Sequence, residues 1–115
     1  MNKVRKLEKN NKVYVAVLVS PDYGAGWYTW NNDHPEILFD PVVVNYLDPN
    51  YGTSYNAEKY DGIDAYLTAT YNGGYFGGLS GLVIEWVQEG LEFKIDEYDG
   101  SETLMIKEWI EFITA

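Results

Sequence analysis

The feature that most constrains the fold is a run of seven apolar residues, Val13–Val19, which is rich in β-branched side chains and closed by Ser20 and Pro21. β-Branched residues favour strands, and a strand that is apolar at every position is covered on both faces. The run is too short to cross a bilayer, which takes roughly 20 apolar residues. We therefore predict a central strand over 13–19, packed on both sides.

Two helices are predicted after this strand. The pair Asp40-Pro41 is typical of a helix start, because Asp caps the first turn and proline fits the first helical position. We expect this helix to be short and to end before Pro49. The segment Asn56–Tyr71 has a roughly helical spacing of apolar residues, although Leu67–Tyr71 equally fits a strand. We interpret the whole segment as a helix.

The C-terminal third predicts three strands in a meander, over residues 79–87, 91–96 and 103–107. The middle strand alternates apolar and charged residues, which is typical of a strand with one wet face. An Asp-Gly pair at 99–100 favours a tight turn. Residues 108–114 fit a last strand or a helical turn. The predicted fold class is α+β, with a mostly antiparallel sheet of about four to five strands and one or two short helices.

Charge is distributed unevenly along the chain. The 115 residues carry a net charge of −10, yet five of the eight bases lie in the first twelve residues. From Val13 onward three bases face seventeen acids, a balance of −14. We therefore divide the chain into a basic N-terminal arm, 1–12, and a single α+β domain, 13–115. Direct nucleic-acid or membrane binding is not expected, because an acidic body repels phosphates.

An enzymatic function is not favoured by the residue types present. The chain has no cysteine, and its one histidine, His34, lies in an Asn-rich stretch that suits a surface bend. The acids of Asp96–Glu102 could bind a cation or act as an acid–base pair, but they lack EF-hand spacing and fit a β-turn with solvated acids. We expect no catalytic residue, no metal site and no cofactor.

A glycine-punctuated loop follows the central strand and is dense in aromatic rings. Nineteen rings, 17% of the chain, are too many for one small core, so some must lie at a surface, a groove or an interface. Rings beside exposed backbone N–H groups could hold a planar heterocycle; alternatively, the loop buries its own rings. The predicted ligand-binding residues are Tyr23, Gly24, Gly26, Trp27, Thr29, Trp30, Asn31, Tyr98, Asp99 and Glu102.

Two long blocks carry a resemblance to a known family. The segment Val17–Asn31 is similar to an S-P-G-Y-G-A-G-W-S-T-W-N motif, and Val87–Glu102 to a V-P-x-G-x-x-F-x-I-x-E-Y-D-G-S-E motif. Shorter matches are an F-D-P step at Phe39–Pro41 and a Y-x-G-G step at Tyr75–Gly78. With these motifs the chain, from Val13 to its end, resembles a family of small bacteriophage and prophage proteins of unknown function.

The chain departs from these family motifs at Asp22, Tyr28 and Gln88, where the family usually has Gly, Ser and Pro. The charge of Asp22 disfavours an anionic ligand at that edge of the loop. The resemblance implies a phage origin and a location in the host bacterial cytoplasm, in keeping with the absence of an apolar signal core after the basic start. It supplies no known reaction.

We therefore expect a non-enzymatic phage antagonist of bacterial defence that sequesters a small nucleotide-like immune signal. In this hypothesis Tyr23, Trp27 and Trp30 stack on the base, while Asp99 and Glu102 accept hydrogen bonds from the ligand. Few bases outside the arm could neutralise phosphates, but a homo-oligomer could bring them from the arm of another copy.

The alternative is an acidic protein–protein inhibitor that mimics nucleic acid and occupies the basic groove of a host defence protein such as a CRISPR nuclease. Such a mimic should lose its partner steeply as salt rises, whereas a ligand sponge should depend on Trp27. A third class, an enzyme that degrades the signal, would need the carboxylate turn at 96–102 to be catalytic.

Overall fold

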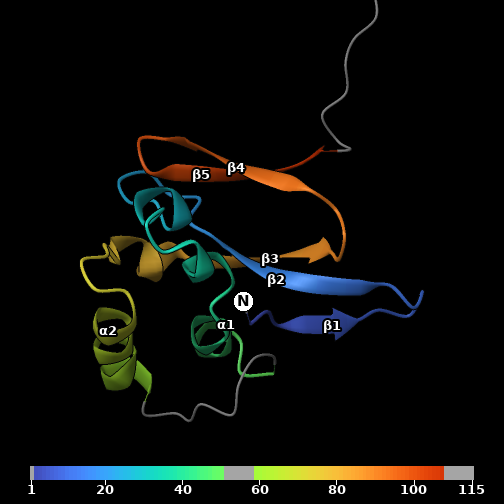
Figure 1. Cartoon of the computed structure of the whole chain (residues 1–115), viewed down its shortest axis with the longest axis horizontal. Coiled ribbons are helices and arrows are strands. Elements are labelled where there is room, and N and C mark those ends of the chain that lie inside the picture. Colours follow the sequence, from blue (N-terminus) through green and yellow to red (C-terminus); the bar gives the residue numbers. More distant parts are fainter. Residues whose placement is uncertain (1, 51–58, 108–115) are drawn as a thin grey trace, which may run out of the picture.

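The central strand is β2 (Val13–Val19), which pairs antiparallel with β1 (Arg5–Leu7) on one side and β3 (Val83–Gln88) on the other (Figure 1). The computed structural model describes residues 2–50 and 59–107. Residues 15–20 are all buried, so the prediction of a strand covered on both faces is confirmed.

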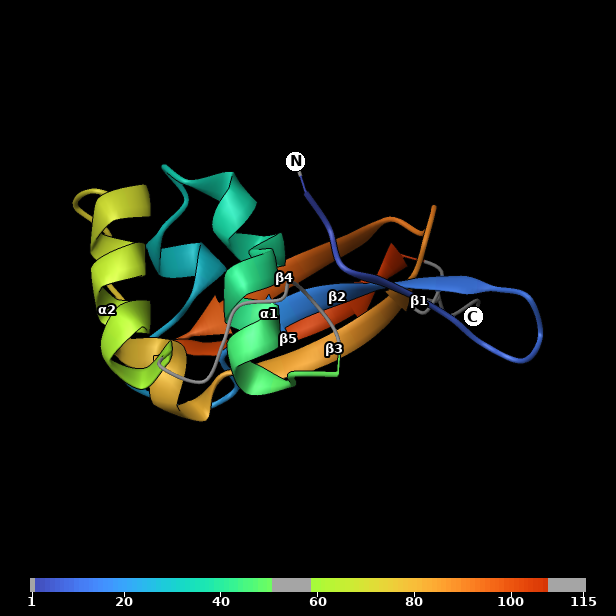
Figure 2. The same ribbon diagram turned by 90° about the horizontal axis from the view of Figure 1, so that it is seen from below.

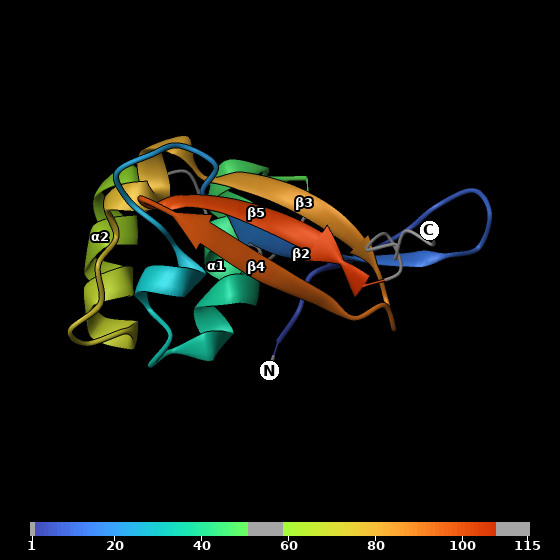
Figure 3. The ribbon, with the colours of Figure 1, turned by 90° about the horizontal axis from the view of Figure 1, so that it is seen from above.

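Each face of β2 supports its own hydrophobic cluster. Ala16 and Leu18 point toward α1 (Pro41–Leu47) and α2 (Lys59–Thr70), which lie on the near side in Figure 2. Val15, Val17 and Val19 belong to the other cluster, with residues of the hairpin of β4 (Phe93–Tyr98) and β5 (Ser101–Ile106). Figure 3 shows this hairpin lying over β2. The alternation of side chains along one strand therefore builds a three-layer molecule.

The α+β class with mostly antiparallel strands is confirmed, but the predicted C-terminal meander is wrong. β3 begins at Val83 and pairs with β2, and the β4–β5 hairpin forms a separate two-stranded sheet. The glycine-rich segment Gly77–Gly81 is a 3-10 helix, so residues 79–81, predicted as the start of a strand, are helical instead. Glycine favours turns over strand interiors, which explains the 3-10 helix. Leu91 and Phe93 pack in the second cluster, so the chain crosses to the other layer as it enters β4.

The two predicted helices are confirmed over the described residues. Asp40 caps α1 as expected: its Oδ1 accepts hydrogen bonds from the backbone N–H of Val42 at 2.8 Å and of Val43 at 3.0 Å. Two further 3-10 helices, Tyr28–Trp30 and Pro35–Phe39, lead from the aromatic loop into α1. The predicted residues 56–58 and 108–114 lie outside the described part of the chain.

The basic N-terminal segment contributes to the sheet. Val4 is buried and its carbonyl accepts a hydrogen bond from the backbone N–H of Ala16, while residues 5–7 form β1. A turn joins β1 to β2, with Asn11 at φ 63°, a left-handed conformation that Asn tolerates. We call residues 3–15, which span β1, this turn and the start of β2, the basic hairpin. Within the described ranges, no helix has both the length and the apolarity needed to cross a membrane.

The tip of the β4–β5 hairpin packs tightly against the loop after β2, and this predicts a difference between two glycines. Gly100 and Gly90 have similar φ angles of +87° and +94°, but a Cβ on Gly100 would lie 2.3 Å from Ala25 N, whereas one on Gly90 meets nothing within 4 Å. Gly90→Ala should cost about 1–2 kcal/mol of unfolding free energy through backbone strain alone. Gly100→Ala should cost roughly 1–3 kcal/mol more through the clash.

Urea denaturation followed by tryptophan fluorescence measures both variants. Equal losses would contradict the packing of the hairpin tip on the loop.

Candidate functional site

One buried carboxylate organises the aromatic loop. Glu102, on β5, is only 3% exposed, and its Oε1 accepts a hydrogen bond from Ser20 N–H at 2.9 Å. Its Oε2 accepts three more, from Trp27 N–H and Thr29 N–H at 2.9 Å and from the Thr29 hydroxyl at 2.6 Å. A single side chain therefore fixes both the start and the end of the loop through charge-assisted hydrogen bonds.

The β4–β5 turn ties the middle of the loop down as well. Gly24 N–H donates to the Asp99 carbonyl at 2.7 Å, and Ser101 Oγ donates to the Pro21 carbonyl at 2.6 Å. Gly24 has φ +101°, which explains glycine at this position. The loop and the turn, predicted separately as parts of one site, do come together.

Three of the predicted ligand contacts are instead interior contacts of the loop. Trp27 has no exposed surface, and its indole N–H donates to the Ile37 carbonyl at 3.1 Å. The Asn31 amide, 4% exposed, donates to the carbonyls of Trp27 and Tyr75 and accepts from Tyr75 N–H. Both carboxylate oxygens of Glu102 accept hydrogen bonds from the loop. None of these side chains is placed to stack on a base or to bind a ribose.

Gly26 and Thr29 also serve the interior packing of the loop. Gly26 is buried, and a Cβ there would lie 2.6 Å from Thr29 Oγ1, so glycine is required by close packing. The Thr29 hydroxyl is already bonded to Glu102. Glycine at position 26 is therefore explained by how the loop packs on its own side chains.

The remaining predicted rings lie at the surface. Tyr23 and Tyr98 are 72% and 76% exposed and meet edge to face, with their centroids 6.4 Å apart. Trp30, 40% exposed, packs against Tyr75 at a centroid distance of 5.3 Å. We call the exposed pair of tyrosines, together with the neighbouring acids Asp22, Asp96, Glu97 and Asp99, the aromatic tip. The tip is therefore an exposed surface next to the loop that Glu102 holds.

A hollow lies on a different part of the molecule, against the basic hairpin. It has a volume of about 440 Å³ and is lined by Lys6, Glu8, Lys9, Asn10, Tyr14 and Trp86. Lys6 lies opposite Tyr14 in the β1–β2 pairing, and its Nζ is 4.4 Å from the centroid of the Trp86 ring and 3.2 Å from Glu8 Oε1. We call this the lysine–tryptophan hollow.

A second hollow of about 270 Å³ shares both rings of the first. Its lining includes Leu91, Leu104 and Ile106, together with the polar side chains of Glu85 and Gln88. Tyr14 and Trp86 therefore line both hollows. No residue of the aromatic tip lines either hollow.

The lysine–tryptophan hollow was missed because its residues come from segments that were interpreted separately. Trp86 belonged to a predicted strand and the lysines to a predicted arm. The available signal was the turn-forming run 9–12, Lys-Asn-Asn-Lys, which predicts a hairpin that places Lys6 beside Tyr14. The pairing of β2 with β3, which adds Trp86, has no local signal.

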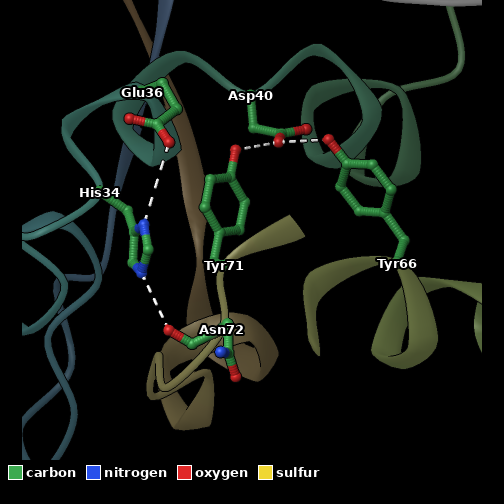
Figure 4. Close-up of polar contacts among 6 residues, drawn as sticks. All are labelled: His34, Glu36, Asp40, Tyr66, Tyr71 and Asn72. Atoms are coloured by element: carbon green, nitrogen blue, oxygen red, sulfur yellow. Dashed lines mark hydrogen bonds and ion pairs between the residues drawn. The ribbon is translucent and has the colours of Figure 1, made fainter. Parts of the chain in front are cut away.

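A buried polar cluster links α1 to α2 (Figure 4). Asp40 Oδ2 accepts hydrogen bonds from the hydroxyls of Tyr66, at 2.6 Å, and of Tyr71. Burial, followed by the hydrogen bond and charge of Asp40, raises the pKa of both phenols far above the usual range. Both tyrosines therefore stay neutral and act as donors that hold the capping carboxylate.

His34 lies beside this cluster. Its Nε2 is 3.1 Å from the Asn72 carbonyl and its Nδ1 is 4.0 Å from Glu36, while its ring lies edgewise on Tyr71 at 5.5 Å between centroids (Figure 4). These contacts hold a bend. Across residues 2–50 and 59–107, no group of three or more histidine or acidic side chains is placed to hold a metal ion.

The acids of the 96–102 turn diverge. Asp96 lies 3.6 Å from Lys94, Glu97 Oε2 accepts from Gly100 N–H at 2.7 Å, and Glu102 points inward. This is the arrangement of a capped β-turn.

No family model matches the chain, and comparison with curated proteins and with solved structures finds no match either.

Because Glu102 holds the loop through four hydrogen bonds, replacing it by glutamine should lower the free energy of unfolding substantially. Glu102→Gln keeps one oxygen but turns an amide N–H₂ toward a backbone donor, which leaves that buried donor unsatisfied at a cost of about 1–3 kcal/mol, plus the loss of charge assistance. Glu97→Gln, on the paired strand and exposed, keeps an oxygen that can accept from Gly100 N–H, so it should change stability by about 0.5 kcal/mol or less. Chemical denaturation compares the two, and an equal effect would refute the anchor.

The two raised tyrosine pKa values predict alkaline destabilisation. In the unfolded chain both phenols lose their protons near the ordinary pKa of 10.0, whereas in the folded protein they remain protonated. The unfolded state therefore binds fewer protons above pH 10, and the free energy of unfolding falls by up to about 1.4 kcal/mol per pH unit for each tyrosine.

Urea denaturation from pH 7 to 11 measures this slope. Tyr71→Phe should lower stability at pH 7 but halve the alkaline slope, whereas Tyr23→Phe, at an exposed ring, should leave the slope unchanged. An unaltered slope in Tyr71→Phe would contradict the account.

Proposed function

We propose that the protein is a non-enzymatic phage antagonist of bacterial defence that sequesters a small, anionic, nucleotide-like signal in the lysine–tryptophan hollow, in the host cytoplasm. The observation that carries the proposal is the meeting of rings and cations in one hollow: Trp86 and Tyr14 with Lys6 and Lys9. The phage origin and the defence context rest on the resemblance of the two long sequence blocks.

The residues of the hollow match the parts of a nucleotide. A base can stack on an aromatic side chain, which contributes about 1–3 kcal/mol. The Asn10 side-chain N–H₂ offers a donor for polar edges, while its Oδ1 accepts from Lys12 N–H at 3.1 Å. Lys6 and Lys9 attract phosphate oxygens, with Lys6 exchanging its contact with Glu8. The hollow is shallow and open to solvent, and its volume of about 440 Å³ leaves room for a nucleotide to lie across Trp86.

Electrostatics favours this hollow over the aromatic tip for an anionic ligand. Beside Tyr23 and Tyr98 stand several carboxylates, which repel phosphate. The basic hairpin holds five of the eight bases of the chain and a single acid, Glu8. Folding β1 onto β2 places that positive segment against the rings of an otherwise acidic molecule. The uneven distribution of charge along the chain argues against a nucleotide at the acidic loop. The same distribution therefore supports one at the basic hairpin.

Calorimetric titration with AMP, ADP-ribose and cyclic di-AMP tests the proposal. We expect saturable binding of at least one of them, and recovery of the nucleotide intact after the complex is denatured. Trp86→Ala, and separately the pair Lys6→Gln and Lys9→Gln, should weaken that binding by about tenfold or more.

Two control variants separate the hollow from general effects. The pair Lys3→Gln and Lys12→Gln removes the same charge from the same hairpin but from residues that do not line the hollow, and should reduce affinity far less. Tyr23→Ala with Tyr98→Ala should leave binding unchanged. The proposal fails if none of the three nucleotides binds, or if binding depends on the tyrosines and not on Trp86.

A further inference from the structure

We propose that copies of this chain associate head to tail, with the basic hairpin of one copy docked on the aromatic tip of the next. The inference concerns two surfaces of the protein itself and does not depend on the proposed nucleotide. It starts from where these surfaces lie. The β1–β2 turn and the β4–β5 turn stand at opposite ends of the horizontal, longest axis in Figure 1. One copy can therefore offer both surfaces at once.

The two surfaces are complementary in charge. The basic hairpin holds five bases and one acid, a balance of +4, whereas the four acids of the tip are accompanied by one nearby base, Lys94. Lys9 and Lys12 are exposed and take part in none of the ion pairs found among the described residues. The same holds for Asp22 and Asp99 at the tip. These four charged side chains can pair with groups of another molecule. A second copy of this chain offers groups of the opposite charge.

The exposed tyrosines add binding free energy that surface ion pairs alone do not provide. A surface ion pair contributes little, but tyrosine rings are frequent anchors of protein interfaces and attract lysine ammonium groups over their faces. Tyr23 and Tyr98 are the two most exposed large hydrophobic residues in the described part of the chain. The hydrogen bonds from Gly24 N–H to the Asp99 carbonyl and from Ser101 Oγ to the Pro21 carbonyl hold the backbone next to both rings, so docking orders little that is not already ordered.

The basic hairpin is equally well formed. Its turn is closed by hydrogen bonds from Glu8 N–H to the Lys12 carbonyl and from Asn11 N–H to the Glu8 carbonyl, both at 2.9 Å. Because the tip and the hairpin are different surfaces, the contact is heterologous: it closes into a ring or continues as a filament. The overall charge of −10 opposes association, but at 0.15 M salt charges beyond about 8 Å are screened while the local contacts persist.

Sedimentation velocity of the nucleotide-free protein, from 1 to 200 µM at about 0.15 M salt, tests the inference with two variants. The tip variant carries Tyr23→Lys and Tyr98→Lys, and the hairpin variant carries Lys9→Glu and Lys12→Glu. All four positions are exposed, so both variants should fold. Wild type should sediment above the monomer mass of 13.2 kDa, and each variant alone should be a monomer.

The decisive sample is an equimolar mixture of the two variants. It contains one intact tip, from the hairpin variant, and one intact hairpin, from the tip variant. It should therefore form a one-to-one dimer that grows no further. A wild type that stays monomeric over the whole range, or association that neither variant disturbs, would overturn the inference. So would a mixture that fails to pair.

The outcome can be separated from that of the proposed function. The monomeric tip variant retains the whole lysine–tryptophan hollow, so a calorimetric titration of this variant with the same nucleotides tests ligand binding without association. Association with no nucleotide binding supports the inference and rejects the proposed function; the reverse result does the opposite.

Discussion

The structure depends on the burial of one carboxylate. Glu102 leaves an exposed hairpin and enters the protein between the end of β2 and the aromatic loop, where it accepts four hydrogen bonds. A buried charge is costly unless it is fully hydrogen-bonded, and here the donors come from a loop that would otherwise hold buried N–H groups without partners. The carboxylate and the loop therefore satisfy each other. This contact also joins the two-stranded sheet to the three-stranded one.

The sequence was informative wherever the structure is local. Strand 13–19, the Asp40 cap and the Asp-Gly turn follow from side-chain preferences over a few neighbouring residues, and all three are confirmed. The pairing of β3 with β2 joins residues about seventy positions apart, and no turn sequence encodes it. The partners of Glu102 and the approach of Lys6 to Trp86 are equally non-local, because only the folded layers bring them together.

Which rings of the glycine loop reach the surface could be predicted only in part, for the same reason. The composition indicated that some rings must lie at the surface, and Tyr23 and Tyr98 do, but it could not say which rings the loop would bury. Trp27 is enclosed because Glu102 draws its backbone inward, a contact between residues 75 positions apart. The uneven distribution of charge along the chain carries through into the fold. The folded protein has an acidic aromatic tip and a basic hairpin that faces Trp86.

The central claim is that a nucleotide-like anion binds beside Trp86 and not at the glycine loop. The most direct measurement is an amide and indole NMR titration of the ¹⁵N-labelled protein with ADP-ribose. The account predicts shifts of the Trp86 indole signal and of the amides of residues 6–14, with the amides of residues 22–29 unmoved. Shifts concentrated at residues 22–29 and 98–100, with the hairpin silent, would contradict it.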